Sequence, residues 1–199
     1  YAVINCNARG NYGYGEAFSD ATRGRWGDLD YADNMAFLHD ALEAHPHLDG
    51  SRLAVAGGSY GGFMASWIAA RHDEFRAVVV DRTLFNRYAF GGTSDIGMLL
   101  DHIEFDGKNP WEAAEAYIRW SPIDSVAGIR APTLVVHSAA DHRCPIDQGE
   151  QLYASLKVLG VPTEFVRFPD ETHELSRSGK PWHRAFRLER YLDWFERHL

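Results

Sequence analysis

Short apolar runs recur along the chain and are separated by longer stretches of mixed polarity. Five of these runs, at residues 2–5, 53–56, 77–80, 133–136 and 164–168, have the length and composition of β-strands. The run at 77–80 has the sequence AVVV, which is typical of a strand buried on both faces. The pattern therefore predicts a sheet that is covered on both sides.

Most intervals between these runs have the periodicity of helices. Residues 28–44 predict a helix whose small and apolar positions gather near one face, formed by Leu29, Ala32, Asp33, Ala36, Phe37 and Asp40. The C-terminal helix is the clearest, because its apolar residues form a single stripe of Leu188, Tyr191, Leu192, Phe195 and Leu199.

Further helices are expected at 60–71, 147–159 and 110–117, the last with Pro110 in its first turn. Residues 91–106 show no clear period, and we expect them to be rich in loops. Strands that alternate with helices predict parallel βαβ units, and hence an α/β fold with a mostly parallel sheet flanked by helices.

The length of 199 residues suits one domain with one core and is too short for two. The opening sequence YAVINCNARG already has the character of a strand, with no initiator methionine and no lead-in. We therefore expect residues 1–199 to be a single domain from the C-terminal part of a longer polypeptide, with N-terminal strands missing. A deliberately shortened chain would begin in the same way.

The composition excludes several classes of protein. The net charge of −8 leaves no basic stripe to neutralise phosphates, so we expect no nucleic-acid partner. No apolar run approaches the roughly 20 residues that cross a bilayer, so we expect no membrane partner. The only cysteines, Cys6 and Cys144, do not make a disulfide scaffold, which favours a reducing, cytoplasmic location.

The sequence LAVAGGSYGGFMASWIAA, at 53–70, places four glycines around Ser59, between a predicted strand and a predicted helix. A phosphate-binding loop would need a Lys-Ser/Thr pair after its glycines, and a dinucleotide site would need Gly-x-Gly-x-x-Gly; neither is present. The pattern Gly57-x-Ser59-x-Gly61 is instead that of a nucleophile elbow, with a plain glycine-rich turn as the alternative.

An elbow has a physical reason for its glycines. The serine occupies a strained turn that lifts its hydroxyl clear of the sheet, and a side chain at Gly57 or Gly61 is expected to collide across that turn. The helix that follows directs its N-terminal amides toward the serine, where a developing oxyanion would lie.

A serine nucleophile needs a base and an acid, which follow it in the order Ser, Asp, His in this architecture. Asp141 comes just after the strand at 133–136, and His173 just after the strand at 164–168. Taken singly, Asp141 could be an ordinary turn residue. His173 alone would also mean little, because the chain has ten histidines and most histidines lie at the surface or in a satisfied core position. Three matches in the right order, each after a strand, favour a Ser-His-Asp hydrolase.

Metal chemistry has weaker support. His45, His47, His137 and His142 lie in or near predicted loops, but no H-E-x-x-H motif or cysteine pair accompanies them. We therefore expect no metal and no cofactor.

Several motifs together resemble the catalytic domain of the prolyl oligopeptidase family of serine peptidases, over essentially the whole chain. The resemblance is strongest to its acylaminoacyl-peptidase-like and dipeptidyl-peptidase-like branch. The motifs are NARG at 7–10 with GYG at 13–15, GGSYGG at 57–62, GTSDIG at 92–97, HSAADHRCP at 137–145 and HELSRSGKP at 173–181. The resemblance implies an α/β-hydrolase fold.

The resemblance also implies roles for individual residues. Ser59 matches the nucleophile, His173 the general base and Asp141 the acid that orients it. The backbone N–H of Tyr60 matches one donor of the oxyanion hole. Arg143 matches an arginine that contacts a substrate carbonyl, and the pocket before the scissile bond is expected to be lined by Cys144, Tyr60, Leu84 and Phe85.

The chain also departs from the family. It lacks the early His-Gly-Gly-Pro-like loop that supplies a second oxyanion donor, and it lacks the N-terminal β-propeller that filters substrates by size. Ala8 stands where relatives often have proline. The resemblance therefore implies two partners: a short peptide substrate, and the absent propeller and strands of the same protein. Whether further copies of the chain associate with it is left open.

Three hypotheses remain at this stage. The first is a serine peptidase that releases acylated amino acids, dipeptides or short oligopeptides. The second is a carboxylesterase or lactone hydrolase on the same scaffold, since fold and triad do not determine the acyl group. The third is a catalytically silent fragment that keeps the motifs.

Overall fold

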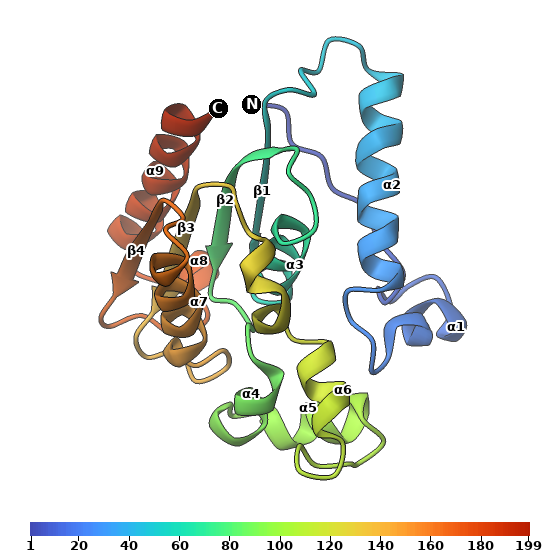
Figure 1. Ribbon diagram of the computed structural model, residues 1–199. Helices are drawn as coiled ribbons and strands as arrows, with labels where there is room; N and C mark the ends of the chain where they lie inside the picture. The colour runs from blue at the N-terminus through green and yellow to red at the C-terminus, as the bar shows by residue number, and fades with distance from the viewer.

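The centre of the molecule is a parallel sheet of four strands (Figure 1). The computed structural model describes all residues from 1 to 199. The strands lie side by side in chain order: β1 (Leu53–Gly58), β2 (Phe75–Asp81), β3 (Thr133–Ser138) and β4 (Thr163–Phe168). Four of the five predicted strands are thereby confirmed.

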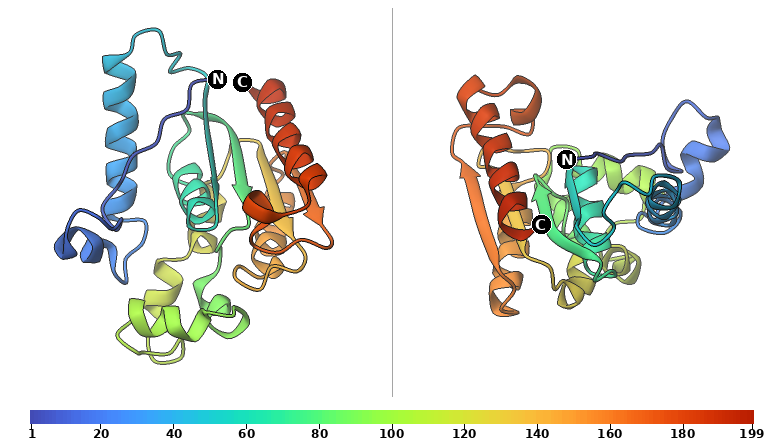
Figure 2. Two further views of the ribbon diagram at one scale, coloured as in Figure 1. Left: turned by 180° about the vertical axis from the view of Figure 1, so that it is seen from behind. Right: turned by 90° about the horizontal axis from the view of Figure 1, so that it is seen from above.

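Helices cover both faces of this sheet, so the α/β architecture is confirmed (Figure 2). Alternate residues of a strand point to opposite faces. One face packs against α3 (Tyr60–Ala69) and α7 (Ile146–Val158), and it includes Val78 and Val80 of β2. The other face includes Val79 and packs against the C-terminal helix. The central strand is therefore buried on both sides, as its sequence predicts.

The helix predicted at 28–44 is confirmed as α2 (Leu29–Ala44), which follows α1 (Glu16–Ser19) and a short 3₁₀ turn, η1 (Asp20–Thr22). Its predicted apolar face is wrong. The side chains that pack against the core are Tyr31, Met35 and Leu38, whereas Phe37 is 42% exposed. The small residues that suggested the other face have little apolar area to bury, so the larger side chains determine the orientation.

The strand predicted at residues 2–5 is wrong, because this segment makes no strand hydrogen bonds. A strand exists only where a neighbour accepts and donates its backbone hydrogen bonds. Here the segment runs beside β1 without pairing to it, and a cavity of about 1290 Å³ lies between them, lined by residues 1–6, 53–56 and parts of α2 and α3. β1 is thus an edge strand with one unpaired side.

A small helical lobe lies at the carboxyl ends of the strands, at the bottom of Figure 1. It consists of α4 (Arg87–Thr93), α5 (Gly97–Glu104) and α6 (Ala114–Arg119), and a 3₁₀ segment, η2 (Pro122–Gly128), leads from it back to the sheet, where its Ile123 and Val126 pack against the core. The expectation of loops at 91–106 is therefore wrong, and the helix predicted at 110–117 begins four residues later, at Ala114.

Close packing explains why glycines occur in helices here. A Cβ atom at Gly97 would lie 2.3 Å from the carbonyl oxygen of Gly91, and one at Gly91 would lie 2.2 Å from a carboxylate oxygen of Asp101. The glycines lower intrinsic helix propensity, but they let α4 and α5 approach each other. Tertiary contact outweighs local propensity in this lobe.

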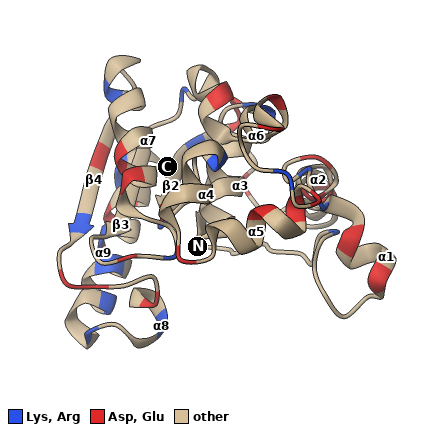
Figure 3. Cartoon of the chain, turned by 90° about the horizontal axis from the view of Figure 1, so that it is seen from below, with Lys and Arg blue, Asp and Glu red and all other residues tan.

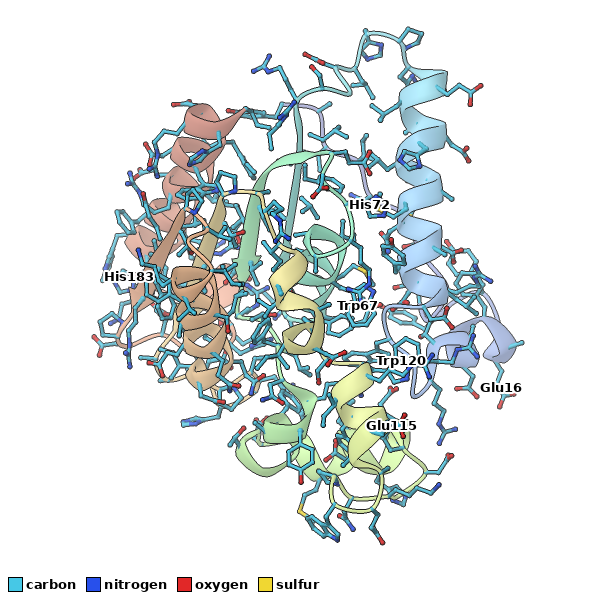
Figure 4. All side chains as sticks on the ribbon, viewed as in Figure 1. Glu16, Trp67, His72, Glu115, Trp120 and His183 are labelled. Atoms are coloured by element: carbon cyan, nitrogen blue, oxygen red, sulfur yellow. The ribbon has the colours of Figure 1, made fainter.

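The lobe is joined to α3 by two stacked indole rings. The ring centroids of Trp67 on α3 and Trp120 at the end of α6 are 6.1 Å apart, and both residues are labelled in Figure 4. The guanidinium of Arg71 lies 3.4 Å from the centroid of the Trp67 ring. These contacts fix the lobe relative to the sheet edge at which the strands end.

The C-terminal helix is confirmed as α9 (Pro181–His198), and a short helix, α8 (Leu175–Ser178), precedes it. Its predicted stripe is only partly correct. Tyr191, Phe195 and Leu199 pack against the sheet together with the fully buried Trp194. Leu188 and Leu192, in contrast, are 55% and 47% exposed. The bulk of Trp194 turns the helix toward one side of the expected stripe.

Charged residues are dispersed over the molecule. Lys and Arg are scattered among Asp and Glu in the view of Figure 3. None of the helices combines the length and the apolar character that a bilayer crossing requires.

Candidate active site

Ser59 lies in a sharp turn between the end of β1 and the start of α3. Its backbone has φ 63° and ψ −123°, a conformation that is costly for a residue with a side chain. The Ser59 N–H donates to the carbonyl of Asp81 at 3.0 Å, while the Ser59 carbonyl accepts from Gly62 and Phe63 at 2.9 and 3.1 Å. These bonds hold the turn in its strained form.

Glycines make room for this turn, although not at both of the expected positions. A Cβ atom at Gly57 would lie 2.1 Å from the carbonyl oxygen of Gly61, and one at Gly62 would lie 2.7 Å from that of Asp81. At Gly61 itself a Cβ atom would meet nothing within 4 Å, so the collision predicted there is wrong. The crowded positions are Gly57 and Gly62.

The contrast between the crowded Gly57 and the open Gly61 allows a prediction about stability, in which one position is the control for the other. We expect Gly57→Ala to lower the free energy of unfolding by about 1–3 kcal/mol or more, because the added methyl group meets rigid backbone. Gly61→Ala is expected to be neutral or slightly stabilising, because alanine favours the helix. Denaturant unfolding of the two variants measures both values. Equal destabilisation at the two positions would contradict this account of the turn.

The structure brings Ser59, His173 and Asp141 together at the carboxyl edge of the sheet. The Nε2 atom of His173 lies 2.9 Å from the Oγ atom of Ser59. Its Nδ1 atom lies 2.8 Å from the Oδ2 atom of Asp141. Because Asp141 follows β3 and His173 follows β4, a continuous chain of hydrogen bonds crosses three loops of the same edge.

The carboxylate of Asp141 is buried and fully engaged. Its Oδ2 atom accepts from His173, and its Oδ1 atom accepts the backbone N–H groups of Arg143 and Cys144 at 2.9 and 2.8 Å. The side chain has no exposed surface. Its orientation toward the imidazole is therefore fixed by its own loop.

The loop that contains His173 is fixed by Glu171. One carboxylate oxygen of Glu171 accepts the backbone N–H of Lys180 at 3.0 Å and the Nδ1–H group of His183 at 2.6 Å. His183, labelled in Figure 4, is on α9. The position of the imidazole of His173 is thus tied to the helix that covers one face of the sheet.

Tyr60 directly follows Ser59 at the first position of α3. Its backbone N–H makes no hydrogen bond within the chain, as is usual for the first amides of a helix. Its hydroxyl donates to Asp30, and its ring packs edge-on against Trp26 with 5.0 Å between centroids. Burial and the nearby Asp30 carboxylate raise the pKa of the Tyr60 hydroxyl well above its usual value. The side chain is thereby held in one orientation beside Ser59.

Arg143 lies at the surface beside this site, and its side chain is 44% exposed. Its Nε atom lies 2.7 Å from a carboxylate oxygen of Asp95, an ion pair that raises the pKa of the Arg143 guanidinium. Asp95 lies in the loop between α4 and α5, so the guanidinium is already engaged in an ion pair within the chain.

The other residues expected to line a substrate pocket are mostly interior. Cys144 is 3% exposed, and burial raises the pKa of its thiol to about 12. Leu84 packs in the same apolar cluster as Cys144 and Phe63. Phe85 is fully buried in a different cluster, with Leu152 and Leu156 of α7. Their role toward a substrate stays a prediction.

Two residues near the site, Asp30 and Asp81, have no local signal in the sequence. Asp30 is buried within α2, yet it accepts the Tyr60 hydroxyl and the backbone N–H of Gly27. Asp81 binds the guanidinium of Arg187 at 2.7 Å and the hydroxyl of Tyr191 at 2.9 Å, which links α9 to the elbow. Such partners lie 30 to 110 positions apart. Asp95, which pairs with Arg143, differs from them because it lies within the motif GTSDIG at 92–97.

The side chains at this edge do not form a metal centre, since the chain contains no group of three or more His, Cys, Asp or Glu residues arranged to hold an ion. The polar groups converge instead on one hydroxyl, one imidazole and one carboxylate. What such an arrangement can do chemically is transfer a proton from the hydroxyl as it attacks an electrophile.

The sheet order, the strained serine turn and this hydrogen-bonded chain define the fold as that of an α/β-hydrolase catalytic domain. The profile of the prolyl oligopeptidase family matches residues 1–199. The chain belongs to that family.

Individual relatives agree with this membership. The chain is 42% identical over all of its length to the uncharacterized peptidase YuxL of Bacillus subtilis, of which it covers 30%. It is 31% identical to dipeptidyl-peptidase 5 of Aspergillus oryzae, with 100% of this chain and 27% of that protein aligned. The chain thus spans less than a third of the length of these relatives.

A solved structure has the same fold. Acylaminoacyl peptidase of Pyrococcus horikoshii superposes with a TM-score of 0.93 and 34% identity, covering 97% of this chain and 32% of that one. A puromycin hydrolase structure superposes with a TM-score of 0.83 and 27% identity, covering 96% of this chain and 28% of that one.

Proposed function

We propose that the chain is the catalytic domain of a serine peptidase that hydrolyses short peptides or N-acylated peptides. The observation that supports this most is the hydrogen-bonded series from Ser59 through His173 to Asp141 on a strained elbow. Membership of the prolyl oligopeptidase family, and the peptidase names of its relatives, support a peptide as the substrate.

The proposed reaction has two halves. In the first, Ser59 Oγ attacks the scissile carbonyl carbon while His173 Nε2 takes the hydroxyl proton; the tetrahedral adduct then collapses as that proton passes to the departing amine. In the second, His173 takes a proton from water as the water attacks the acyl carbon; the second adduct then collapses, the bond to Ser59 Oγ breaks, His173 returns the proton to Oγ and the acyl group leaves as a carboxylic acid. Asp141 keeps Nδ1 protonated and stabilises the imidazolium that forms transiently.

The adduct carries a negative oxygen that needs donors. The backbone N–H of Tyr60 is free and stands at the N-terminus of α3 directly after Ser59, where amides and the helix dipole favour a negative oxygen. We assign Tyr60 as one donor. The second donor is expected from the portion of the protein that precedes this chain.

Peptide and ester hydrolysis are distinguished by one pair of substrates. We expect an anilide amide and an aryl ester with the same acyl group both to be cleaved, with an amide rate that is a substantial fraction of the ester rate. A carboxylesterase on the same scaffold would cleave the ester and leave the amide almost untouched. That result would replace the peptidase proposal by the esterase alternative.

The role of Arg143 toward a substrate can be tested by comparing peptide and ester substrates. If its guanidinium leaves Asp95 to bind a substrate carbonyl, Arg143→Ala removes a charge-assisted hydrogen bond of roughly 1.5–3 kcal/mol. We therefore expect kcat/KM to fall about 10-fold or more for peptides that reach the arginine, and little for small aryl esters. Asp95→Asn serves as the control, since it breaks the ion pair and keeps the guanidinium. Equal losses on both substrates, together with lower stability, would contradict the substrate role.

We also propose that the protein continues on the N-terminal side with at least one strand and a β-propeller. Three observations support the strand: β1 has a free edge, the segment 1–6 is extended but unpaired, and the cavity between them is mostly apolar. Its volume of about 1290 Å³ exceeds the usual range of small-molecule pockets. An inserted strand would pair with both segments and satisfy their backbone groups.

The cellular location is proposed from the cysteines. Cys6 and Cys144 are both free thiols, and Cys144 is buried without a partner cysteine. We place the protein in the cytoplasm, where thiols remain reduced.

A further inference from the structure

The carboxylate of Asp141 belongs to a short loop, Asp141–Cys144, that we name the acid loop. Two of its carbonyl groups are held from the lobe: Ser94 Oγ donates to the carbonyl of Arg143 at 2.6 Å, and the Asp95 N–H donates to that of His142 at 2.8 Å. These contacts hold the outer side of the loop. The inner side of the loop, which faces the sheet, needs contacts of its own.

His137, near the end of β3, lies beneath the inner side and is completely buried. Its Nε2 atom lies 2.7 Å from the carbonyl oxygen of Cys144, the last residue of the acid loop. A carbonyl only accepts, so the Nε2–H group of His137 donates this bond. The same Nε2 atom lies 3.8 Å from the Oδ2 atom of Asp141, which is the oxygen bound to His173.

The rest of the pocket around His137 fits a neutral ring. Burial lowers the pKa of the imidazole, although the hydrogen bond to the Cys144 carbonyl and the nearby carboxylates of Asp141 and Asp81 oppose this. The Nδ1 atom has no hydrogen-bond partner. It faces Gly149 on α7, where a Cβ atom would lie only 2.6 Å from it. The absence of a side chain at this helical position makes room for the ring.

We propose that His137 is a positioning residue for the catalytic acid. By binding the Cys144 carbonyl from inside the sheet, it fixes the acid loop so that both Asp141 oxygens keep their partners and Oδ2 points at His173. A neutral ring does this without adding a second cation that would compete with His173 for the carboxylate. This inference rests on the proposed function, since it assigns a role within the same site.

The primary test compares His137→Leu with His137→Gln in the protein at its full natural length. Leucine removes the donor, while a glutamine amide places a donor at about the same distance from the backbone as Nε2. We expect His137→Leu to lower kcat about 10- to 100-fold with an almost unchanged KM, since a misplacement of about 1 Å costs rate on that scale. We expect His137→Gln to recover most of the loss. A folded His137→Leu variant with normal kcat, or a glutamine variant no better than leucine, would overturn the proposal.

A second variant decides the question if His137→Leu fails to fold. Gly149→Ala keeps the histidine and pushes on its ring, and Gly50→Ala is its control, because a Cβ atom at Gly50 makes only ordinary contacts of 3.7 Å. An alanine inside a helix ordinarily stabilises it, so a lower kcat in a folded Gly149→Ala variant supports the proposal. A kcat equal to that of Gly50→Ala overturns it.

The same experiment separates this inference from the proposed function. If the wild-type protein cleaves neither substrate and a fluorophosphonate does not label Ser59, the proposed function has failed. If the wild type is active and labelled, while the His137 and Gly149 variants match it, only the role of His137 has failed.

Discussion

Ser59→Ala and His173→Ala are each expected to lower the turnover of the full-length protein about 10³-fold or more. Alanine at Ser59 removes the oxygen that forms the acyl-enzyme, and alanine at His173 removes the only base within hydrogen-bond distance of it. The members of such a triad act as a unit, so either loss alone removes most of the rate. Asp141→Asn is expected to cost a similar amount or somewhat less, because the asparagine would no longer stabilise the imidazolium.

The controls for these variants lie at the other end of the molecule. Ser51→Ala removes a hydroxyl that binds only Asp49, just before β1. His39→Ala removes a half-exposed imidazole on α2. Both should keep wild-type turnover on the amide and ester pair. Near-normal hydrolysis by Ser59→Ala would show that another group is the nucleophile.

The second large effect concerns residues 1–199 expressed alone. We expect this polypeptide to hydrolyse peptides about 10²–10³-fold more slowly than the full-length protein, since the loss of one oxyanion donor has a cost of that size. We also expect it to aggregate readily, because the free edge of β1 and the apolar cavity beside it are exposed to other chains.

Two measurements on the isolated polypeptide test this expectation. Light scattering after size-exclusion chromatography reports its state of association, and the anilide assay reports its rate. Adding the N-terminal portion as a separate chain should restore part of the activity if that portion fills the cavity. A monomeric, cooperatively unfolding polypeptide with the full rate would show that the strand and the propeller are not needed.

Much of the fold could be predicted because its signals are local. The strands β1 to β4 are short apolar runs bounded by loops, and the ends of α3 and α7 differ from the predictions by a few residues at most. The order of the candidate triad was also predictable, since each member follows a strand and parallel strands end at one edge. The structure then places these side chains 2.8 to 2.9 Å apart in series.

What could not be predicted depends on contacts between distant parts of the chain. The helices α4 and α5 exist because Gly91 and Gly97 allow close packing, which local propensity opposes. The orientation of α2 depends on which large side chains meet α3. The Arg143–Asp95 ion pair and the bond from His137 to the acid loop join groups whose proximity only the folded chain reveals.

The most direct test of the account is covalent labelling of the full-length protein with a fluorophosphonate, which reacts with an activated serine. The account predicts one label per chain, located by peptide mass spectrometry on Ser59. It also predicts that labelling is lost in both Ser59→Ala and His173→Ala and retained in Ser51→Ala. A folded protein that takes no label, or that takes it on another serine, would contradict the assignment of Ser59 as the nucleophile.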